Sequence, residues 1–308
     1  MNAPTPVHRG RFAPSPTGPL HFGSLVAAAG SFLEARKRGG EWHLRIEDVD
    51  APRCSQAAAD EILRTLEACG FAWDGEVVWQ SRRGDAYAAA LERLKAEGRV
   101  FACTCTRREL ADSAIAPDGA TIYPGTCRQG LAAGRPERAW RLRVGDAHVS
   151  FDDAIQGHID SDLAGEAGDF ILLRADGLFA YQLAVVVDDA ESAITQVVRG
   201  ADLLASTARQ IFLQQCLGLP TPGYAHLPVA VNTEGEKLSK QTRATPVDGV
   251  RPGPALFAAL EFLGQRPPAE LSCAVPAELW AWAMRHWRLD RVSRGPACPA
   301  VTGGIIAP

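Results

Sequence analysis

Apolar and polar positions form a regular pattern along the first hundred residues, in which short apolar runs are separated by longer stretches at helical spacing. The runs that predict strands cover residues 9–13, 42–46 and 77–79. The stretches that predict helices cover residues 21–38, 55–69 and 84–97. Strands that alternate with helices in this way predict an α/β fold with a parallel sheet covered by helices.

The pattern changes between about residues 101 and 165. Cysteines, Gly/Pro turns and short β-like segments at 139–144 and 148–151 replace the alternation. We therefore predict an inserted subdomain in this part of the chain.

The alternation of strands and helices returns after the insertion. Apolar runs cover residues 170–173, 183–187 and 227–231, and predicted helices cover 203–217, 254–264 and 277–287. The last segment, 295–308, is rich in Gly, Pro and Ala, and we expect it to be loose.

Composition sets limits on location and partners. The 308 residues are 46% hydrophobic and 22% charged, which is ordinary for a globular protein, and the net charge is −4. No apolar run has the length of a membrane span and the N-terminus has no apolar signal core, so we expect a cytoplasmic protein without a membrane partner. The chain lacks the basic excess common in nucleic-acid binders, and we expect no DNA partner. RNA contact would come from local clusters such as residues 36–38 or 82–83, although each cluster alone is more typical of a solvated helix end.

Residues 11–25, RFAPSPTGPLHFGSL, carry the strongest chemical signal. A predicted strand ends in a Pro/Gly loop, and a helix follows near His21. A helix N-terminus offers unpaired N–H groups and a positive dipole end, which suit a phosphate. Gly18 and Gly23 would let a ligand approach the backbone closely, and His21 in the first turn could contact a phosphate. Alone, such a loop is also compatible with an ordinary strand-to-helix turn.

A second signal is KLSKQ at residues 237–241, where Lys237 and Lys240 flank a serine. Two lysines on a loop can neutralise the charge that develops when a triphosphate is attacked. Taken by itself, this segment is more typical of an exposed basic loop.

Taken together, the motifs resemble a known family. HFGS at 21–24 and KLSKQ are similar to the HIGH and KMSKS signatures of class I aminoacyl-tRNA synthetases. The segments RIEDVD (45–50), YQLAVVVDD (181–189) and VVRGADLLAST (197–207) resemble the glutamyl branch of that class. The resemblance covers residues 9–245.

The resemblance implies a Rossmann-like parallel-sheet catalytic domain with an inserted zinc-containing subdomain and a short helical C-terminal region. It divides the chain into four parts. Residues 1–100 are the first half of the catalytic domain, 101–165 the inserted acceptor-binding subdomain, 166–245 the second half with the KLSKQ loop, and 246–308 a helical region without an anticodon-binding domain.

The resemblance also implies the roles of individual residues. The glutamate-binding residues would be Arg11, Ser15, Glu47, Tyr181 and Arg199. Guanidinium groups bind carboxylates in a bidentate manner, and a carboxylate such as Glu47 suits the substrate ammonium. For Arg11 and Arg199 the alternative is a structural salt bridge at the sheet edge. The related glutaminyl enzymes lack an arginine at the position of Arg199, so this residue indicates the acid rather than the amide.

The implied chemistry is attack by a glutamate carboxylate on the α-phosphate of ATP, which gives glutamyl-adenylate and pyrophosphate. The ATP-binding residues would be Gly18, His21, Gly23, Lys237 and Lys240. His21 would contact the phosphates and Lys240 would stabilise transition-state charge, so these two are the predicted catalytic residues. Magnesium is expected with ATP, and the sequence names no protein ligand for it.

Three of the eight cysteines lie close together in the predicted insertion. Cys103, Cys105 and Cys127 suggest a tetrahedral zinc site, and their alternative role is that of reduced, small apolar core residues. Spacing alone leaves the fourth ligand open between Tyr123 and His148. The short glutamyl-queuosine branch of the family has two cysteines, a tyrosine and a cysteine here, which implies Tyr123 and a structural zinc ion.

Only 68 residues follow Lys240, too few for the anticodon-binding region of a full glutamyl enzyme. The glutamyl-queuosine branch attaches glutamate to the queuosine base in the anticodon loop of tRNA(Asp), and its resemblance implies ATP, L-glutamate and queuosine-containing tRNA(Asp) as partners. One alternative is a minimal synthetase that charges the tRNA 3′ end. The other is a non-catalytic protein that binds glutamate or a nucleotide.

Overall fold

The computed structural model describes residues 7–116, 119, 121–232, 247 and 249–299. Its first part has the predicted alternation. The strands are β1 (Arg9–Phe12), β2 (Glu41–Ile46) and β3 (Val78–Trp79), and they pair in parallel in the order β1-β2-β3. The helices are α1 (Phe22–Lys37), α2 (Gln56–Ala68) and α3 (Gly84–Ala96).

Helix α2 shows how the local sequence produces these elements. The Ser55 side chain caps its N-terminus by accepting a hydrogen bond of 3.2 Å from the backbone N–H of Ala58. Ile62 and Leu66 are four residues apart and are both buried, so one face of the helix covers the core. Gly70 follows the end of the helix with a φ of 75°, a conformation that favours glycine.

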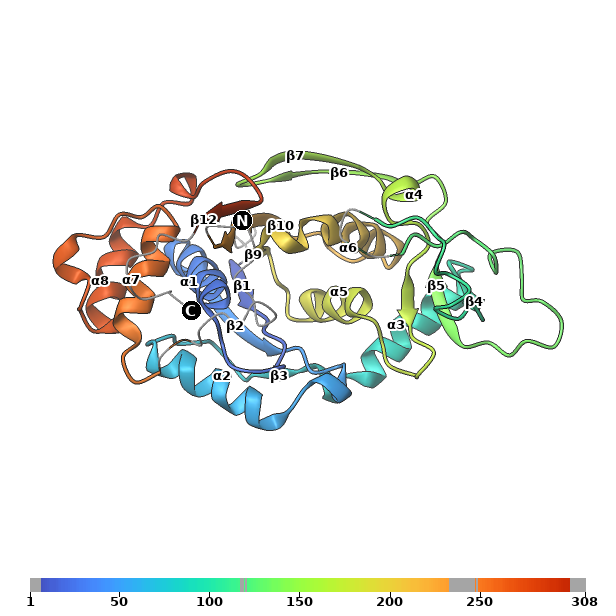
Figure 1. The fold of residues 1–308 in the computed structure, drawn as a ribbon, viewed down its shortest axis with the longest axis horizontal. Coiled ribbons are helices and arrows are strands. Elements are labelled where there is room, and N and C mark those ends of the chain that lie inside the picture. The colour runs from blue at the N-terminus through green and yellow to red at the C-terminus, as the bar shows by residue number, and fades with distance from the viewer. Residues whose placement is uncertain (1–6, 117–118, 120, 233–246, 248, 300–308) are drawn as a thin grey trace, which may run out of the picture.

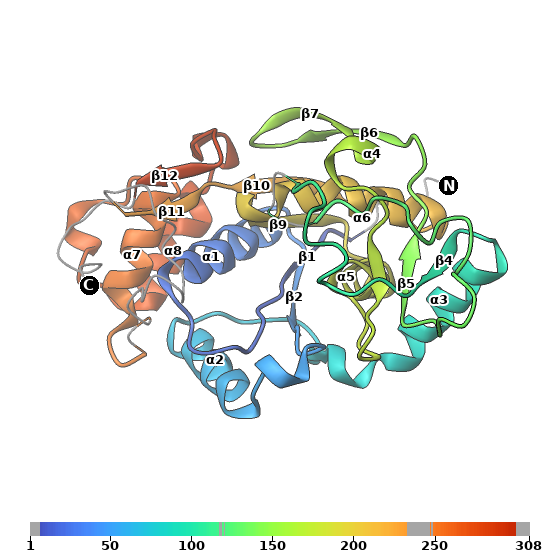
Figure 2. The same ribbon diagram turned by 45° about the vertical axis from the view of Figure 1, so that its right-hand side comes forward.

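The second half of the chain adds further parallel strands beside the first three. Strands β9 (Gln196–Gly200) and β10 (Gly223–Leu227) are parallel, and β6 (His148–Asp153) is parallel to β10 on its other side. The backbone N–H of Thr195 donates to the carbonyl oxygen of Arg9 at 2.9 Å, which joins β9 to β1. Figures 1 and 2 show these strands meeting at the centre of the molecule. The parallel sheet expected from the sequence is confirmed.

Helices α5 (Tyr181–Glu191) and α6 (Leu204–Cys216) follow the insertion. The apolar run at 183–187 lies inside α5, where all five residues are buried in a second core cluster together with residues of α6 and α3. Such a run is compatible with a buried helix as well as a strand.

The region around the predicted insertion is mostly antiparallel. Strands β4 (Val100–Cys103), β5 (Ala139–Leu142) and β8 (Ile171–Leu173) form one sheet, and β7 (Gly157–Asp162) forms a hairpin with β6. A short helix, α4 (Leu163–Glu166), follows the hairpin. Strands β4 and β7 were not predicted. The four-part division of the chain stays a prediction.

The C-terminal part contains the two predicted helices, α7 (Pro252–Phe262) and α8 (Pro276–His286), at the end of the molecule opposite the inserted sheet (Figure 1). The predicted strand at 227–231 is divided at Pro228, which follows β10 and precedes β11 (Val229–Val231), because proline offers no N–H for strand pairing. The expectation of a loose tail is wrong for β12 (Ala297–Pro299), which pairs in parallel with β11. Residues 300–308 lie outside the described residues.

Close packing holds α1 against the sheet. A Cβ atom added to Gly30 would lie 2.7 Å from Cδ1 of Leu227, so the helix approaches β10 more closely than a larger residue allows. Aromatic rings fill the space between α1, β2 and α8, where Phe32 packs edge-on against Trp42 at 5.1 Å and against Trp280 at 4.9 Å. These ring contacts hold the C-terminal half of α1 against β2 and α8. None of the described helices has both the length and the hydropathy needed to cross a membrane.

Candidate active site

A pocket of about 490 Å³ opens where four parallel strands, β1, β2, β9 and β10, reach their carboxyl ends. This is the edge at which open α/β sheets bind ligands. The loop after β1, the N-terminus of α1 and the first residue of α5 complete its walls. The five predicted glutamate-binding residues all line it, namely Arg11, Ser15, Glu47, Tyr181 and Arg199. Residues as far apart in the chain as Arg11 and Arg199, which are separated by 188 positions, therefore line one pocket.

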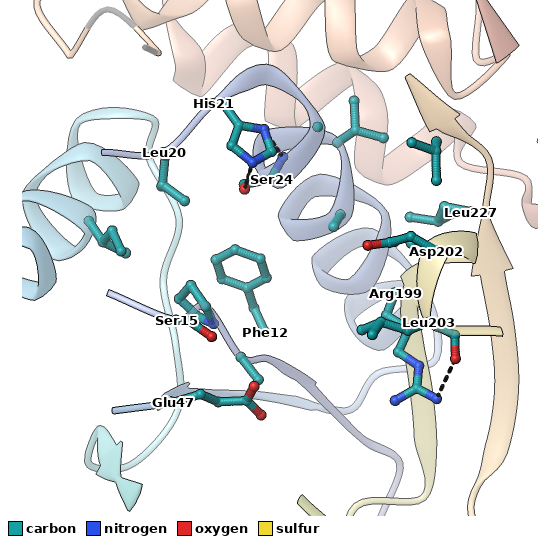
Figure 3. Close-up of a pocket in the computed structure, with 18 of the residues that line it drawn as sticks. Phe12, Ser15, Leu20, His21, Ser24, Glu47, Arg199, Asp202, Leu203 and Leu227 are labelled. Atoms are coloured by element: carbon teal, nitrogen blue, oxygen red, sulfur yellow. Dashed lines mark hydrogen bonds between the residues drawn. The ribbon is translucent and has the colours of Figure 1, made fainter. Parts of the chain in front are cut away.

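The N-terminus of α1 forms one end of the pocket, lined by His21, Gly23 and Ser24 (Figure 3). The sequence predicted His21 within the first turn of the helix, but the structure shows that it is the N-cap residue. Its Nδ1 accepts a hydrogen bond of 3.3 Å from the Ser24 N–H, and its Nε2 lies 3.1 Å from the Ser24 hydroxyl. Gly18 has a φ of 147° in the turn before the helix, a region that favours glycine, and it is not among the lining residues. A helix N-terminus with these groups suits phosphate.

Charged side chains occupy the other end. In Figure 3 the Glu47 carboxylate and the Arg199 guanidinium project from opposite walls of the same end of the pocket. Arg199, at the end of β9, is only 5% exposed. Its nitrogens donate to His226 Nε2 at 3.0 Å, the Thr207 hydroxyl at 2.8 Å, and the Tyr181 hydroxyl and the Leu203 carbonyl at 3.4 Å each.

All of these partners of Arg199 are neutral. No described carboxylate forms an ion pair with it, so the alternative of a structural salt bridge does not apply to this residue. A buried charge without a counter-charge is costly unless something compensates it. An anionic ligand in the pocket would supply that compensation.

Arg11 differs from Arg199, because it does form the salt bridge considered as its alternative role. It donates to both oxygens of Asp189, at 3.2 and 3.3 Å, and still lines the pocket. Arg45 donates to the same Asp189 at 2.6 Å and to Glu47 at 3.2 Å. Burial opposes ionisation of Asp189, but Arg11 and Arg45 outweigh it and lower the pKa of this carboxyl. The network holds Arg11 and Glu47 in fixed positions.

Burial has the larger effect on Glu47. It raises the pKa of this carboxyl despite the opposing effect of Arg45 and Arg11. A cationic ligand group beside Glu47 would therefore find a carboxylate that lacks full compensation.

Ser15 is exposed on the loop after β1 and faces the pocket in Figure 3. Lys237 and Lys240 lie outside the described residues.

The predicted metal ligands come together in the insertion. The Sγ atoms of Cys103, Cys105 and Cys127 lie within 4.8 Å of one another, and the Tyr123 hydroxyl lies 3.5 Å from Sγ of both Cys103 and Cys105. Burial alone would raise the pKa of the Cys127 thiol, but hydrogen bonds from Tyr123 and Thr104 outweigh burial and lower this pKa to about 6. The lowered pKa favours the thiolate, which is the form that metals bind. His148, the other candidate, is an exposed residue of β6 and does not join the cluster. These residues could hold one metal ion.

A sequence profile described as "tRNA synthetases class I (E and Q), catalytic domain" matches residues 7–252. The chain belongs to this family. Membership of the class I synthetases makes the chain a ligase, and it agrees with the carboxyl-edge pocket, the capped N-terminus of α1 and the parallel sheet. The resemblance stated from the motifs is thereby confirmed.

Similar proteins include the "Glutamyl-Q tRNA(Asp) synthetase" of Aromatoleum aromaticum, with 63% identity over 94% of this chain and 91% of the relative. The protein of the same name from Dechloromonas aromatica is 60% identical over 96% and 97%. Among solved structures, a glutamate-tRNA synthetase from Elizabethkingia anophelis superposes with a TM-score of 0.78 at 26% identity, covering 96% of this chain and 68% of the other. The class I synthetase fold therefore extends over nearly the whole chain.

Proposed function

We propose that this synthetase activates L-glutamate with ATP and transfers it to the queuosine base of tRNA(Asp). The single observation that carries the amino-acid part is Arg199, a buried guanidinium whose partners are all neutral and which lines the pocket. The acceptor rests on the names of relatives that are 54–63% identical to this chain.

Glutamate fits the charges of the pocket. Its side-chain carboxylate would pair with Arg199 and accept a hydrogen bond from the Tyr181 hydroxyl, which lies 3.4 Å from Arg199 Nη1. Its ammonium would lie beside Glu47, and Arg11 and Ser15 would bind the reacting end. A glutamine amide in the same position would leave Arg199 buried without a counter-charge.

ATP would occupy the other end, with its phosphates at the N-terminus of α1 near His21 and Gly23. Gly18 permits the tight turn that leads the chain to this position. We assign Lys237 and Lys240 to the charge that develops on the phosphates during attack by the glutamate carboxylate. When bound with ATP, magnesium would neutralise phosphate charge.

A hydroxyl of queuosine then attacks glutamyl-adenylate and forms an ester, and AMP leaves. A cytoplasmic location is part of this proposal, and the two substrates, ATP and tRNA, support it.

Pyrophosphate exchange tests the activation step. We expect exchange that depends on glutamate, ATP and magnesium and needs no tRNA, because every group assigned to activation belongs to the protein. Glutamine should support exchange at least about 30-fold less efficiently, since an unpaired buried charge costs about 2–5 kcal/mol. Lack of exchange with glutamate, or equal exchange with glutamine, would overturn the assignment of the pocket.

We assign the metal of the cysteine cluster to zinc with a structural role. Tetrahedral Zn–S bonds of about 2.3 Å place sulfur atoms about 3.8 Å apart, and Cys105 Sγ lies 3.6 Å from Cys127 Sγ. Tyr123 is the fourth ligand in this assignment. Its oxygen already accepts a 2.8 Å hydrogen bond from the Cys127 N–H, although burial raises the pKa of the phenol.

Elemental analysis and thermal unfolding test the zinc site. We expect about one zinc ion per chain, and Cys105→Ser should lower zinc content and melting temperature together, because ion binding contributes to folding. Cys273→Ser is the matched control, since Cys273 is exposed and lies outside the cluster. If protein without bound metal had the same melting temperature as protein that contains zinc, the zinc assignment would be removed.

A further inference from the structure

A buried pair of residues lies directly behind Arg199. Asp153 is the last residue of β6 and His226 belongs to β10, and the two strands are parallel neighbours. His226 Nδ1 lies 2.6 Å from Asp153 Oδ2, and both side chains are completely buried. On its other side the ring faces Arg199, whose Nε donates to His226 Nε2 at 3.0 Å.

These contacts fix where the imidazole proton must be. Arginine has only donors and does not lose its proton in proteins, so His226 Nε2 must present a lone pair to it. The ring proton is therefore on Nδ1, where it is donated to the Asp153 carboxylate. The Thr207 hydroxyl, 3.2 Å from Nε2, can donate to the same acceptor.

The charge states agree with this arrangement. Burial lowers the pKa of His226 to about 4 despite the neighbouring carboxylate, so the ring is neutral at pH 7. Burial acts in the opposite sense on Asp153, but hydrogen bonds from His226 and Gln156 outweigh it and lower the pKa of this carboxyl to about 2. Asp153 is ionised, and a neutral imidazole separates it from the guanidinium.

We propose that Asp153 and His226 are positioning residues for substrate specificity: Asp153 selects the Nδ1-protonated form of His226, whose Nε2 then orients Arg199 toward the substrate carboxylate. The inference rests on the proposed function, in which Arg199 binds glutamate. The arrangement has a further consequence. Because Asp153 hydrogen-bonds to His226 and the neutral ring lies between Asp153 and Arg199, the carboxylate charge stays away from the guanidinium edge that faces the pocket.

The remaining contacts of Asp153 make an isosteric substitution informative. Its Oδ1 accepts the backbone N–H groups of Ile155 at 3.0 Å, Gln156 at 2.9 Å and His226 at 3.1 Å. In Asp153→Asn the amide oxygen must take this place, because three N–H groups need an acceptor. The amide NH₂ then faces His226 Nδ1 and acts as its donor. The ring proton moves to Nε2, where it meets the Nε–H of Arg199.

We expect Asp153→Asn to lower kcat/KM for glutamate by about 10- to 100-fold, a typical effect of removing a group that orients a ligand. The change should be mainly in KM for glutamate, with KM for ATP altered less than about 2-fold, because ATP binds at the other end.

The control for tautomer dependence is the same substitution in a His226→Gln background. The amide oxygen of the introduced glutamine reaches about as far as Nε2 and can accept from Arg199 whichever group occupies position 153, so His226→Gln alone should lower kcat/KM by less than about 10-fold. His226→Leu, which has no acceptor, should lose more. Within the His226→Gln background, adding Asp153→Asn should cost less than about 3-fold. Equal losses from Asp153→Asn in both backgrounds would show that Asp153 acts only by holding the backbone.

A spectroscopic measurement decides the point without activity. In protein labelled with ¹⁵N-histidine, the ring nitrogen resonances distinguish protonated from unprotonated nitrogen, and His226 is assigned by its absence from the His226→Gln spectrum. We expect protonated Nδ1 in the wild type and protonated Nε2 in Asp153→Asn. Protonated Nε2 in the wild type, or an unchanged tautomer in the variant, would overturn the inference. Wild-type protein that fails to exchange pyrophosphate with glutamate would instead overturn the proposed function, while the tautomer of His226 found in the ¹⁵N spectra would still stand.

Discussion

Arg199→Ala is expected to lose roughly 30- to 4,000-fold in kcat/KM for glutamate activation. Removing one partner of a desolvated charge pair costs about 2–5 kcal/mol, and each 1.4 kcal/mol is a factor of ten. Arg199 is 5% exposed and has only neutral partners in the described part of the chain, so the substrate carboxylate would lose its only assigned cationic partner at that position. The loss should be seen in glutamate-dependent pyrophosphate exchange.

The same experiment contains its own controls. KM for ATP should change little, because the N-terminus of α1 lies at the other end of the pocket (Figure 3). Arg93→Ala serves as the matched arginine control, since Arg93 pairs with Glu97 on the exposed face of α3. Arg199→Ala that activates glutamate as well as the Arg93→Ala protein does would show that the pocket assignment is wrong.

The five proposed glutamate-binding residues, all of which line the pocket, could be named from the sequence because each lies in a local motif. Arg11 and Ser15 belong to one segment, Glu47 to a second, Tyr181 to a third and Arg199 to a fourth. The resemblance carried each of them separately. These residues converge because most of their segments lie at the carboxyl ends of parallel strands, which meet at one edge of the sheet. The remaining segment begins helix α5 beside that edge.

Asp153 and His226 could not be found in the same way. They are 73 positions apart, and neither lies in a segment with a recognisable pattern. Their contact exists because β6, a strand next to the insertion, returns to pair with β10. A single buried aspartate or histidine gives no signal in a sequence, since its role depends on a partner that only the strand order supplies.

The tail shows the same limit for secondary structure. A short segment rich in Gly, Pro and Ala has no hydrophobic period, so it was expected to be loose, yet β12 pairs with β11. Such a strand is stabilised by the free edge that β11 offers rather than by its own sequence. The division at Pro228, in contrast, follows from the residue itself, because proline cannot donate to a sheet.

The position at which glutamate joins the tRNA separates the proposed function from 3′ charging. The proposal predicts that a hydroxyl of queuosine, in the anticodon loop, takes the place of the terminal ribose hydroxyl in the attack on glutamyl-adenylate. The chemistry of ester formation is the same for either acceptor. Activity with bulk tRNA therefore cannot distinguish the two, and the acceptor itself must be altered.

The most direct measurement uses two samples of tRNA(Asp) with labelled glutamate, ATP and magnesium. One sample contains queuosine but lacks its 3′-terminal adenosine, and the other has an intact 3′ end but no queuosine. Arg199→Ala protein provides the background for both samples. We expect the label on the first tRNA and none above background on the second. Label on the second tRNA and none on the first would contradict the proposal and make this protein a synthetase that charges the 3′ end.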